Sequence, residues 1–344
     1  MDAGEMKKYL ILPFAILANL ITQAQHIEVL QQGKPNSIRG LSVVDDHVAW
    51  ISASKGAIAI TNDGGKTWDW KLVAGFEKSD FRDIEAFSAK EAIIMSSGTP
   101  AVILKTVDGG ESWKVKYQNA DSAYFFDAMD FDGLKHGLVL GDPIKGKFLL
   151  METKDGGETW QPFSNPPDAL PGEAAFAASG TCLRLDSDFI YIVTGGSKSR
   201  MLIWFYQKWV NGDKWLALKL AITQGKQSQG AFSLANGGGT IVVGGDYKKD
   251  RIVDSTANYW PNDEHTKSPA TLPEKTPQGF QSCVEYINGS TFISTGTPGS
   301  NITTDGGITW TKIDDAGYNV CRKAKYGSLV LLAGDHGRIG IFKP

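Results

Sequence analysis

The chain has 344 residues, 39 glycines, ten tryptophans and a formal net charge of −3. This charge excludes a general electrostatic attraction to nucleic acid or to anionic membranes, so neither is expected as a partner. The three cysteines are too few for a disulfide scaffold. Cys283 and Cys321 do occupy equivalent positions in two repeats, and with Cys182 we expect them to be buried free thiols.

The first 24 residues have the pattern of an export signal. Lys7 and Lys8 begin a basic region, residues 9–21 are apolar, and small residues end the segment at Ala24. The apolar stretch is too short to cross a membrane at full thickness, and no lipoprotein cysteine follows it. We therefore expect residues 1–24 to be a signal peptide and the mature protein to be periplasmic or secreted. An uncleaved interfacial anchor or a buried helix is the alternative.

Four copies of the octapeptide Thr-x-Asp-Gly-Gly-x-Thr/Ser-Trp begin at Thr61, Thr106, Thr153 and Thr303. The starts are 45, 47 and 150 residues apart, and a period of about 40–50 residues is typical of a radial or solenoid array. Asp-Gly-Gly suits a hairpin turn with positive φ angles, and the Trp is expected to return to the core of its module. The residues with this structural role are Asp63, Trp68, Asp108, Trp113, Asp155, Trp160, Asp305 and Trp310.

Seven such modules account for residues 25–344, which predicts an all-β, seven-bladed β-propeller in a single domain. Blades four and five have lost the octapeptide: blade four retains an Asn-Gly hairpin and Trp215, and blade five keeps only Trp260. The last blade ends after Phe342, so the strand near residues 26–30 is expected to fill its outer position and close the ring. The inner strands are predicted to begin near residues 37, 80, 124, 173, 229, 279 and 317.

The octapeptide closely resembles the Asp box, or BNR repeat, of sialidases, sortilin-type receptors and photosystem II assembly factors. Several further segments, among them Gly141-Asp-Pro143 and residues 172–182 and 243–248, look like the bacterial branch related to photosystem II assembly factors. The resemblance spans essentially the whole mature chain. It implies an exported propeller whose photosynthetic relatives are protein-binding assembly factors, and it implies no reaction.

A sialidase-like enzyme is the alternative function. Catalytic sialidases carry an Arg-Ile-Pro motif before the first Asp box, and this chain has none. Their arginine triad holds a sugar carboxylate beside a Tyr–Glu nucleophile pair, and no such pair can be assigned here. The sequence also lacks a Gly-x-Gly-x-x-Gly, a His-Glu-x-x-His and a paired Cys-x-x-Cys. We therefore expect no cofactor and no metal, and no catalytic residue can be assigned from the sequence.

Aligning the inner strands predicts the residues at one mouth of the propeller channel. Arg39, Arg82, Gln281 and Asn319 fall at equivalent positions of four neighbouring blades, whereas Phe126, Ala174 and Gly230 fall there in the other three. Two arginines can hold a carboxylate or phosphate. The alternative is that each arginine pairs with an inner acid such as Asp83, Asp127 or Glu173 and only ties blades together.

Charged loops on the same face complete the predicted binding site. The full set of expected ligand-binding residues is Arg39, Arg82, Asp142, Glu173, Arg200, Asp246, Arg251, Gln281, Asn319 and Arg338. Mixed charges on glycine-rich loops suit recognition of a protein surface or an acidic glycan. The function predicted from the sequence is thus a monomeric, non-catalytic binding or assembly module, and an extracytoplasmic glycoside hydrolase or lyase is the alternative.

Overall fold

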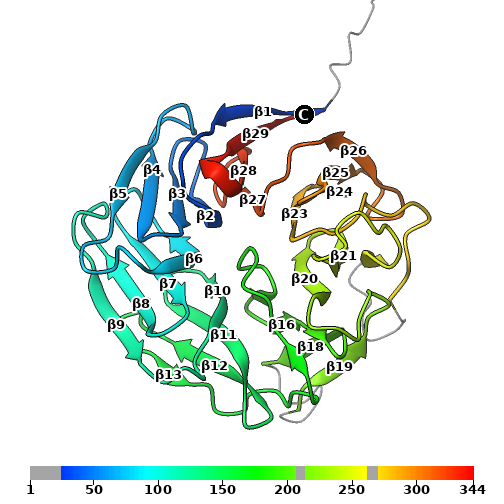
Figure 1. Cartoon of the computed structure of the whole chain (residues 1–344), viewed down its shortest axis with the longest axis horizontal. Coiled ribbons are helices and arrows are strands. Elements are labelled where there is room, and N and C mark those ends of the chain that lie inside the picture. The colour runs from blue at the N-terminus through cyan, green and yellow to red at the C-terminus, as the bar shows by residue number, and fades with distance from the viewer. Residues whose placement is uncertain (1–24, 207–213, 262–269) are drawn as a thin grey trace, which may run out of the picture.

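A computed structural model describes residues 25–206, 214–261 and 270–344 of the chain. In these residues seven sheets are arranged as blades around a common axis, which confirms the predicted all-β, seven-bladed propeller (Figure 1). The predicted signal peptide, residues 1–24, lies outside the described residues. A single turn of 3-10 helix, η1 (Asp335–Gly337), interrupts the strands of the described part. None of the helical segments described has the length and apolar character needed to cross a membrane.

Blades one to three each contain four antiparallel strands that run from the axis outward in chain order. The two middle strands of blades one and two consist entirely of buried residues, as a propeller blade packed on both faces requires. Blade one comprises β2 (Ile38–Val43), β3 (Ala49–Ala53), β4 (Ala57–Thr61) and β5 (Asp69–Leu72); blade two, β6 (Asp80–Ala86), β7 (Ala92–Ser97), β8 (Ala101–Thr106) and β9 (Lys114–Asn119); blade three, β10 (Phe126–Asp132), β11 (His136–Ile144), β12 (Lys147–Thr153) and β13 (Gln161–Pro162).

Blades four and five depart from this pattern. Blade four comprises β15 (Leu183–Leu185), β16 (Phe189–Val193), β18 (Arg200–Phe205) and β19 (Leu216–Lys219); blade five joins β20 (Gln229–Asn236), β21 (Gly239–Asp246) and β22 (Ala257–Pro261) to two short strands, β14 (Glu173–Ala174) and β17 (Gly195–Gly196). The prediction that blade four begins near Glu173 was therefore wrong. Glu173 and Ala174 pair with Gly196 and Gly195 in the sheet of blade five, and the Glu173 carboxylate binds Arg200 of blade four.

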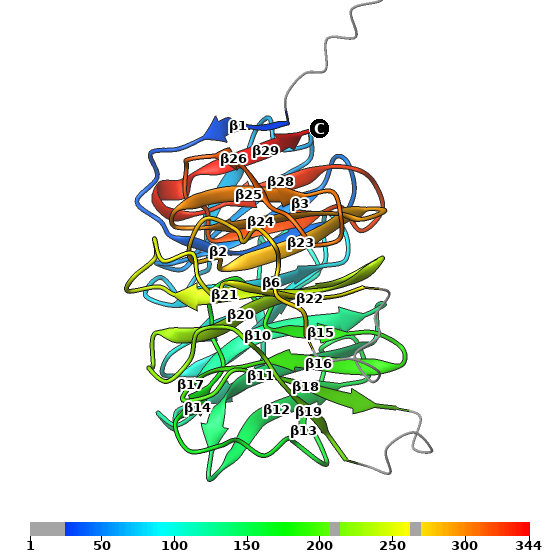
Figure 2. The ribbon, with the colours of Figure 1, turned by 90° about the vertical axis from the view of Figure 1, so that its right-hand side faces the viewer.

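Blade seven closes the ring with a strand from the other end of the chain. β1 (His26–Gln31) is the outer neighbour of β29 (Ile339–Lys343), and its Ile27 stands opposite Phe342 (Figures 1 and 2). The expected closure by the N-terminal strand is thus confirmed, and it removes one exposed sheet edge from each end of the chain. The remaining strands are β27 (Val320–Lys323) and β28 (Val330–Ala333) in blade seven, and β23 (Cys283–Asn288), β24 (Thr291–Gly296), β25 (Gly299–Thr303) and β26 (Thr311–Asp314) in blade six.

The four Asp boxes share one hydrogen-bond geometry. In the first, Thr61 Oγ1 donates to Asp63 Oδ1 at 2.8 Å and accepts the Gly65 amide at 2.9 Å, while Thr67 Oγ1 donates to Asp63 Oδ2 at 2.6 Å. Gly64 and Gly65 have φ angles of 74° and 89°, a region that side-chain-bearing residues rarely adopt. These donors lower the pKa of the Asp63 carboxyl to about 2, with the Thr67 hydroxyl as the largest cause.

The Asp-box tryptophans pack between blades rather than inside their own module. Trp113 of blade two meets Trp50 of blade one edge-on at 6.4 Å, and Trp160 of blade three contacts Phe131 within a cluster that includes Ile93 of blade two. Trp310 is 1% exposed. Each box therefore joins its blade to the preceding one, which makes the repeats mutually dependent.

Candidate functional site: the two mouths of the channel

A β-bulge near the start of the inner strand re-aims one side chain in each of four blades. The register shifts between Ile38 and Gly40, between Phe81 and Asp83, between Phe126 and Ala128, and between Ala231 and Ser233. A bulge bends a strand and turns its extra residue out of the ladder. The bulged residues are Arg39, Arg82, Asp127 and Phe232, and all four line one cavity.

This cavity, the strand-start mouth, has a volume of about 920 Å³ and opens where the inner strands begin. Its wall changes in character around the ring, from Arg39 and Arg82 in blades one and two to Asp127 in blade three. The opposite wall is aromatic: Phe176 stacks on Phe232 at 3.8 Å, and Phe232 meets Phe280 edge-on at 4.7 Å. A polar wall that faces an apolar wall is the usual construction of a ligand pocket.

Arg39 differs from Arg82 in how it is paired. Its half-buried guanidinium makes no hydrogen bond or ion pair with any residue that the structure describes, whereas Arg82 binds Asp80 Oδ2 through Nε at 2.7 Å. Burial lowers the pKa of Arg39, and the like charge of Arg82 lowers it further, against smaller opposing effects of Asp335 and Asp80. Asp335 and Asp80 offset only part of this cost, and an anion bound beside the half-buried guanidinium would reduce it further.

Of the ten residues predicted for this mouth, five line the cavity and five do not. Arg39, Arg82, Asp142, Glu173 and Asn319 line the cavity. Gln281, Arg200, Asp246, Arg251 and Arg338 do not, and for Gln281 the placement at the channel was wrong. Gln281 is fully buried inside blade six, where its Oε1 accepts from Ser294 Oγ at 2.9 Å and from Asn301 Nδ2 at 3.2 Å.

Of the other four residues outside the cavity, three bind partners within the protein. Arg200 binds Glu173 Oε2 at 2.6 Å, and Arg338 donates to the Gly317 carbonyl at 3.0 Å. Asp246 accepts from Gln229 Nε2 at 3.0 Å, while Arg251 is exposed. The alternative in which Glu173 pairs with Arg39 or Arg82 is wrong, because its carboxylate binds Arg200.

Two lining residues could not be predicted by aligning the repeats, because each lies on a bulge that departs from regular strand pairing. Phe126 and Gly230 were aligned with Arg39, but the bulged residues are Asp127 and Phe232, one and two positions later. Phe126 itself is fully buried. A shift of one residue exchanges the two faces of a strand. Arg39, Arg82 and Asp127 recur at the blade period, and this spacing could have indicated that all three face the channel.

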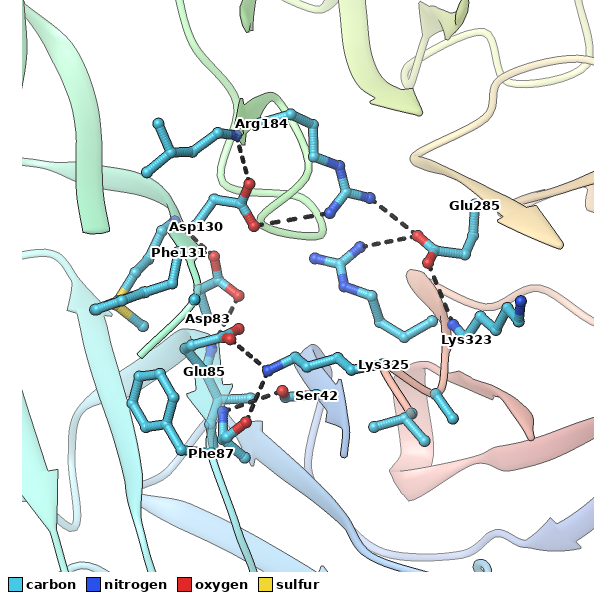
Figure 3. Close-up of a pocket in the computed structure, with 18 of the residues that line it drawn as sticks. Ser42, Asp83, Glu85, Phe87, Asp130, Phe131, Arg184, Glu285, Lys323 and Lys325 are labelled. Carbon is cyan, nitrogen blue, oxygen red and sulfur yellow. Dashed lines mark hydrogen bonds and ion pairs between the residues drawn. The ribbon is translucent and has the colours of Figure 1, made fainter. Parts of the chain in front are cut away.

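The opposite end of the channel, the strand-end mouth, is smaller and is closed by paired charges. Its cavity of about 480 Å³ is lined by the last residues of the inner strands. Arg184 donates to Glu285 Oε2 at 2.9 Å, and Lys325 binds Glu85 and the Ala86 carbonyl (Figure 3). Arg322 donates to the Ser179 carbonyl at 3.1 Å.

Two buried carboxyls lie beneath this network. Burial raises the pKa of Asp83 to about 7 and that of Asp130 to about 6, and Arg322 and Arg184 respectively are the largest opposing influences. Their oxygens accept the backbone amides of Met129 and Leu185 at 2.7 and 2.6 Å. The strand-end mouth therefore joins blades through satisfied ion pairs.

The three cysteines are free and buried, as expected. Cys283 lies close to Cys321 across blades six and seven, with its Sγ 3.4 Å from the Cys321 carbonyl oxygen. Across the described ranges, no group of three or more His, Cys, Asp and Glu side chains is placed to hold a metal ion.

Comparison with known sequences matches both the repeats and the N-terminal third of the chain. Residues 21–120 match the family described as photosynthesis system II assembly factor YCF48, and residues 302–312 match the BNR/Asp-box repeat. The photosystem II assembly lipoprotein Ycf48 of Synechococcus sp. (strain CC9902) is 23% identical over 289 residues, which is 83% of this chain and 76% of that protein. This chain is an Asp-box propeller that resembles the photosystem II assembly factors.

Two further comparisons define how far the resemblance extends. The chloroplastic photosystem II stability/assembly factor HCF136 of Arabidopsis thaliana is 34% identical over 85 residues, 23% of this chain and only 19% of that protein. Among solved structures, YCF48 bound to D1 peptide superimposes with a TM-score of 0.64 at 16% identity, covering 94% of this chain and 98% of that one. YCF48 from Cyanidioschyzon merolae gives a TM-score of 0.64 at 15% identity over 93% and 99%. At these identities the superpositions establish the fold.

Proposed function

We propose that this chain is an exported, non-catalytic propeller that binds a segment of a partner protein at the strand-start mouth, through an anionic group of that segment. The observation that carries the proposal is the unpaired Arg39 guanidinium in a cavity with a facing aromatic wall. Charge-assisted contacts of arginine to carboxylate are strong and directional. The names of the relatives, which are assembly factors, and a solved YCF48 bound to D1 peptide support a protein partner.

The enzyme alternative has less support. A sialidase-like mechanism needs a Tyr–Glu pair beside the arginines. Glu173 is bound by Arg200 and by Thr194 Oγ1 at 2.6 Å, and Tyr247 packs on Phe232 and Phe280. The two make no contact with each other among the described residues. We therefore propose that the cavity binds without catalysis.

The test is capture of partners from an extract of the native cell envelope. Arg39→Ala and Arg82→Ala should each weaken capture, because a charge-assisted contact worth about 1.5–3 kcal/mol corresponds to a loss of roughly 10- to 150-fold. Arg251→Ala is the matched control, since this exposed arginine does not line the cavity.

Three outcomes separate the hypotheses. Loss of a captured protein in the Arg39→Ala/Arg82→Ala double variant supports the proposal. Undiminished capture in the double variant would show that the partner does not bind at the strand-start mouth. Capture of an acidic glycan instead of a protein would contradict the assigned partner class and retain the anion site.

A further inference from the structure

Two carboxyl groups in blade three stand at the strand-start mouth with unused hydrogen-bonding capacity. Asp127, on the bulge of β10, is 1% exposed. Asp142 lies on the neighbouring strand β11, directly after Gly141, which pairs with Phe126. Both line the cavity. Asp127 Oδ2 and Asp142 Oδ1 are buried and have no hydrogen-bond partner in the described part of the chain. Such orphaned oxygens are uncommon in buried positions and are a sign of a missing ligand or water.

The groups around Asp127 do not neutralise it. β6 contributes Arg82, whose Nε is committed to Asp80; β11 contributes Asp142; and the segment before β15 contributes the buried thiol of Cys182. The backbone amide of Ala177 faces the carboxyl. Burial raises the pKa of Asp127 well above its usual range, the charge of Asp142 raises it further, and Arg82 opposes the shift. Burial likewise raises the pKa of Asp142.

The position of Asp127 relative to the arginines decides what a proton on it could do. Arg39, Arg82 and Asp127 all line this cavity, and Arg82, on the middle blade of the three, interacts electrostatically with both of the others. An ionised Asp127 would repel an anion held by Arg39. A neutral carboxyl has an O–H that donates to a carboxylate, and such O–H···O⁻ bonds are short and strong.

We propose that Asp127 is a protonated hydrogen-bond donor to the ligand carboxylate that Arg39 binds, which makes binding at the strand-start mouth acid-dependent. This inference rests on the proposed function, and it adds the chemical class of the ligand group and its regulation. The group is a carboxylate next to an apolar or aromatic side chain, because Phe176, Phe232 and Phe280 form the facing wall. Affinity is highest when Asp127 is protonated and the ligand is ionised, and it falls as pH rises through the pKa of Asp127.

The inference can be tested with N-acetylphenylalanine, which combines an aromatic ring with one carboxylate, and with its amide as the uncharged control. Binding is measured by NMR titration at pH 5.5 and at pH 8.5 on the unmodified protein and on Asp127→Asn, Asp127→Ala and Arg39→Ala. We expect the affinity of the unmodified protein to drop about tenfold or more between the two pH values. Asp127→Asn retains an N–H donor and should bind equally at both. Asp127→Ala should bind weakly at both.

The outcomes distinguish failure of the role of Asp127 from failure of the proposed anion site. Equal affinity at both pH values in the unmodified protein, together with lost binding in Arg39→Ala, overturns the role of Asp127 and leaves the anion site intact. Absence of binding at either pH, or equal binding of the amide, overturns the carboxylate site itself. Thermal melting of each variant verifies that Asp127→Asn, which preserves shape, is folded.

Discussion

Both mouths of the channel are lined by acidic and basic side chains, and they differ in how these are paired. At the strand-end mouth, Arg184, Arg322 and Lys325 each meet a carboxylate or a backbone carbonyl (Figure 3). At the strand-start mouth, Arg39 has no partner among the described residues, and Asp127 and Asp142 each keep an unused oxygen. Charge alone would mark both as binding sites. Whether the charged side chains are already paired distinguishes a mouth that holds blades together from one that can accept a ligand.

The largest expected effect is on stability, at the strand-end mouth. Arg322→Ala removes the main cation beside Asp83 and one of the two cations, with Arg184, that lie near Glu285. Breaking a buried pair in this way typically costs about 3–5 kcal/mol of unfolding free energy. The loss should appear in urea denaturation without weaker partner capture. An unchanged denaturation midpoint would contradict the structural role of this mouth.

The sign of the pH dependence sharpens that prediction. The folded-state pKa values of Asp83 and Asp130, about 7 and about 6, lie above the ordinary value of 3.8. Stability that these groups contribute is therefore complete below about pH 4 and declines as pH rises through 6 to 7. Without Arg322 the decline should be steeper, so the cost of Arg322→Ala should be greater at pH 8 than at pH 5.

A matched pair of carboxyl-to-amide changes has the next largest effect. Glu285→Gln weakens the charged hydrogen bond from Arg184 and should cost about 1.5–3 kcal/mol. Asp142→Asn, at the other mouth, removes a charge that has no ion-pair partner and should change the unfolding free energy by less than about 0.5 kcal/mol. Equal losses in the two variants would break the contrast between the mouths.

The smallest effect concerns the Asp boxes, whose structural role remains a prediction. Asp108→Ala removes the acceptor of the Ser112 hydroxyl and should lower the unfolding free energy only slightly, because the carboxylate is exposed, without altering ligand affinity. The pKa of Asp108 is lowered to about 2 in the folded state, with the Ser112 hydroxyl as the largest cause. Its stabilisation is present above about pH 4 and is lost as pH falls toward 2, so the variant and the unmodified protein should converge in acid. A constant difference down to pH 2 would contradict this account.

The parts of the fold that repeat were predictable from sequence, because each Asp box fixes a turn and a following strand. The closing strand could be inferred because the last blade was one strand short. Blade four could not be delimited: Glu173 looks like the start of a strand, but its carboxylate binds Arg200 and the inner strand begins at Leu183. The mouth was only half predictable, since the bulges replace Phe126 by Asp127 and Gly230 by Phe232, and no local pattern shows that Gln281 turns into its blade.

The most direct test of the contrast is a crossed measurement on Arg39→Ala and Arg322→Ala. Each variant is measured both for capture of partners from the cell envelope and for unfolding free energy in urea. We predict that Arg39→Ala loses capture roughly 10- to 150-fold and retains stability, while Arg322→Ala loses stability and, where still folded, retains capture. If Arg39→Ala instead lost stability and kept full capture, the strand-start mouth would be a structural tie like its counterpart, and the account would be contradicted.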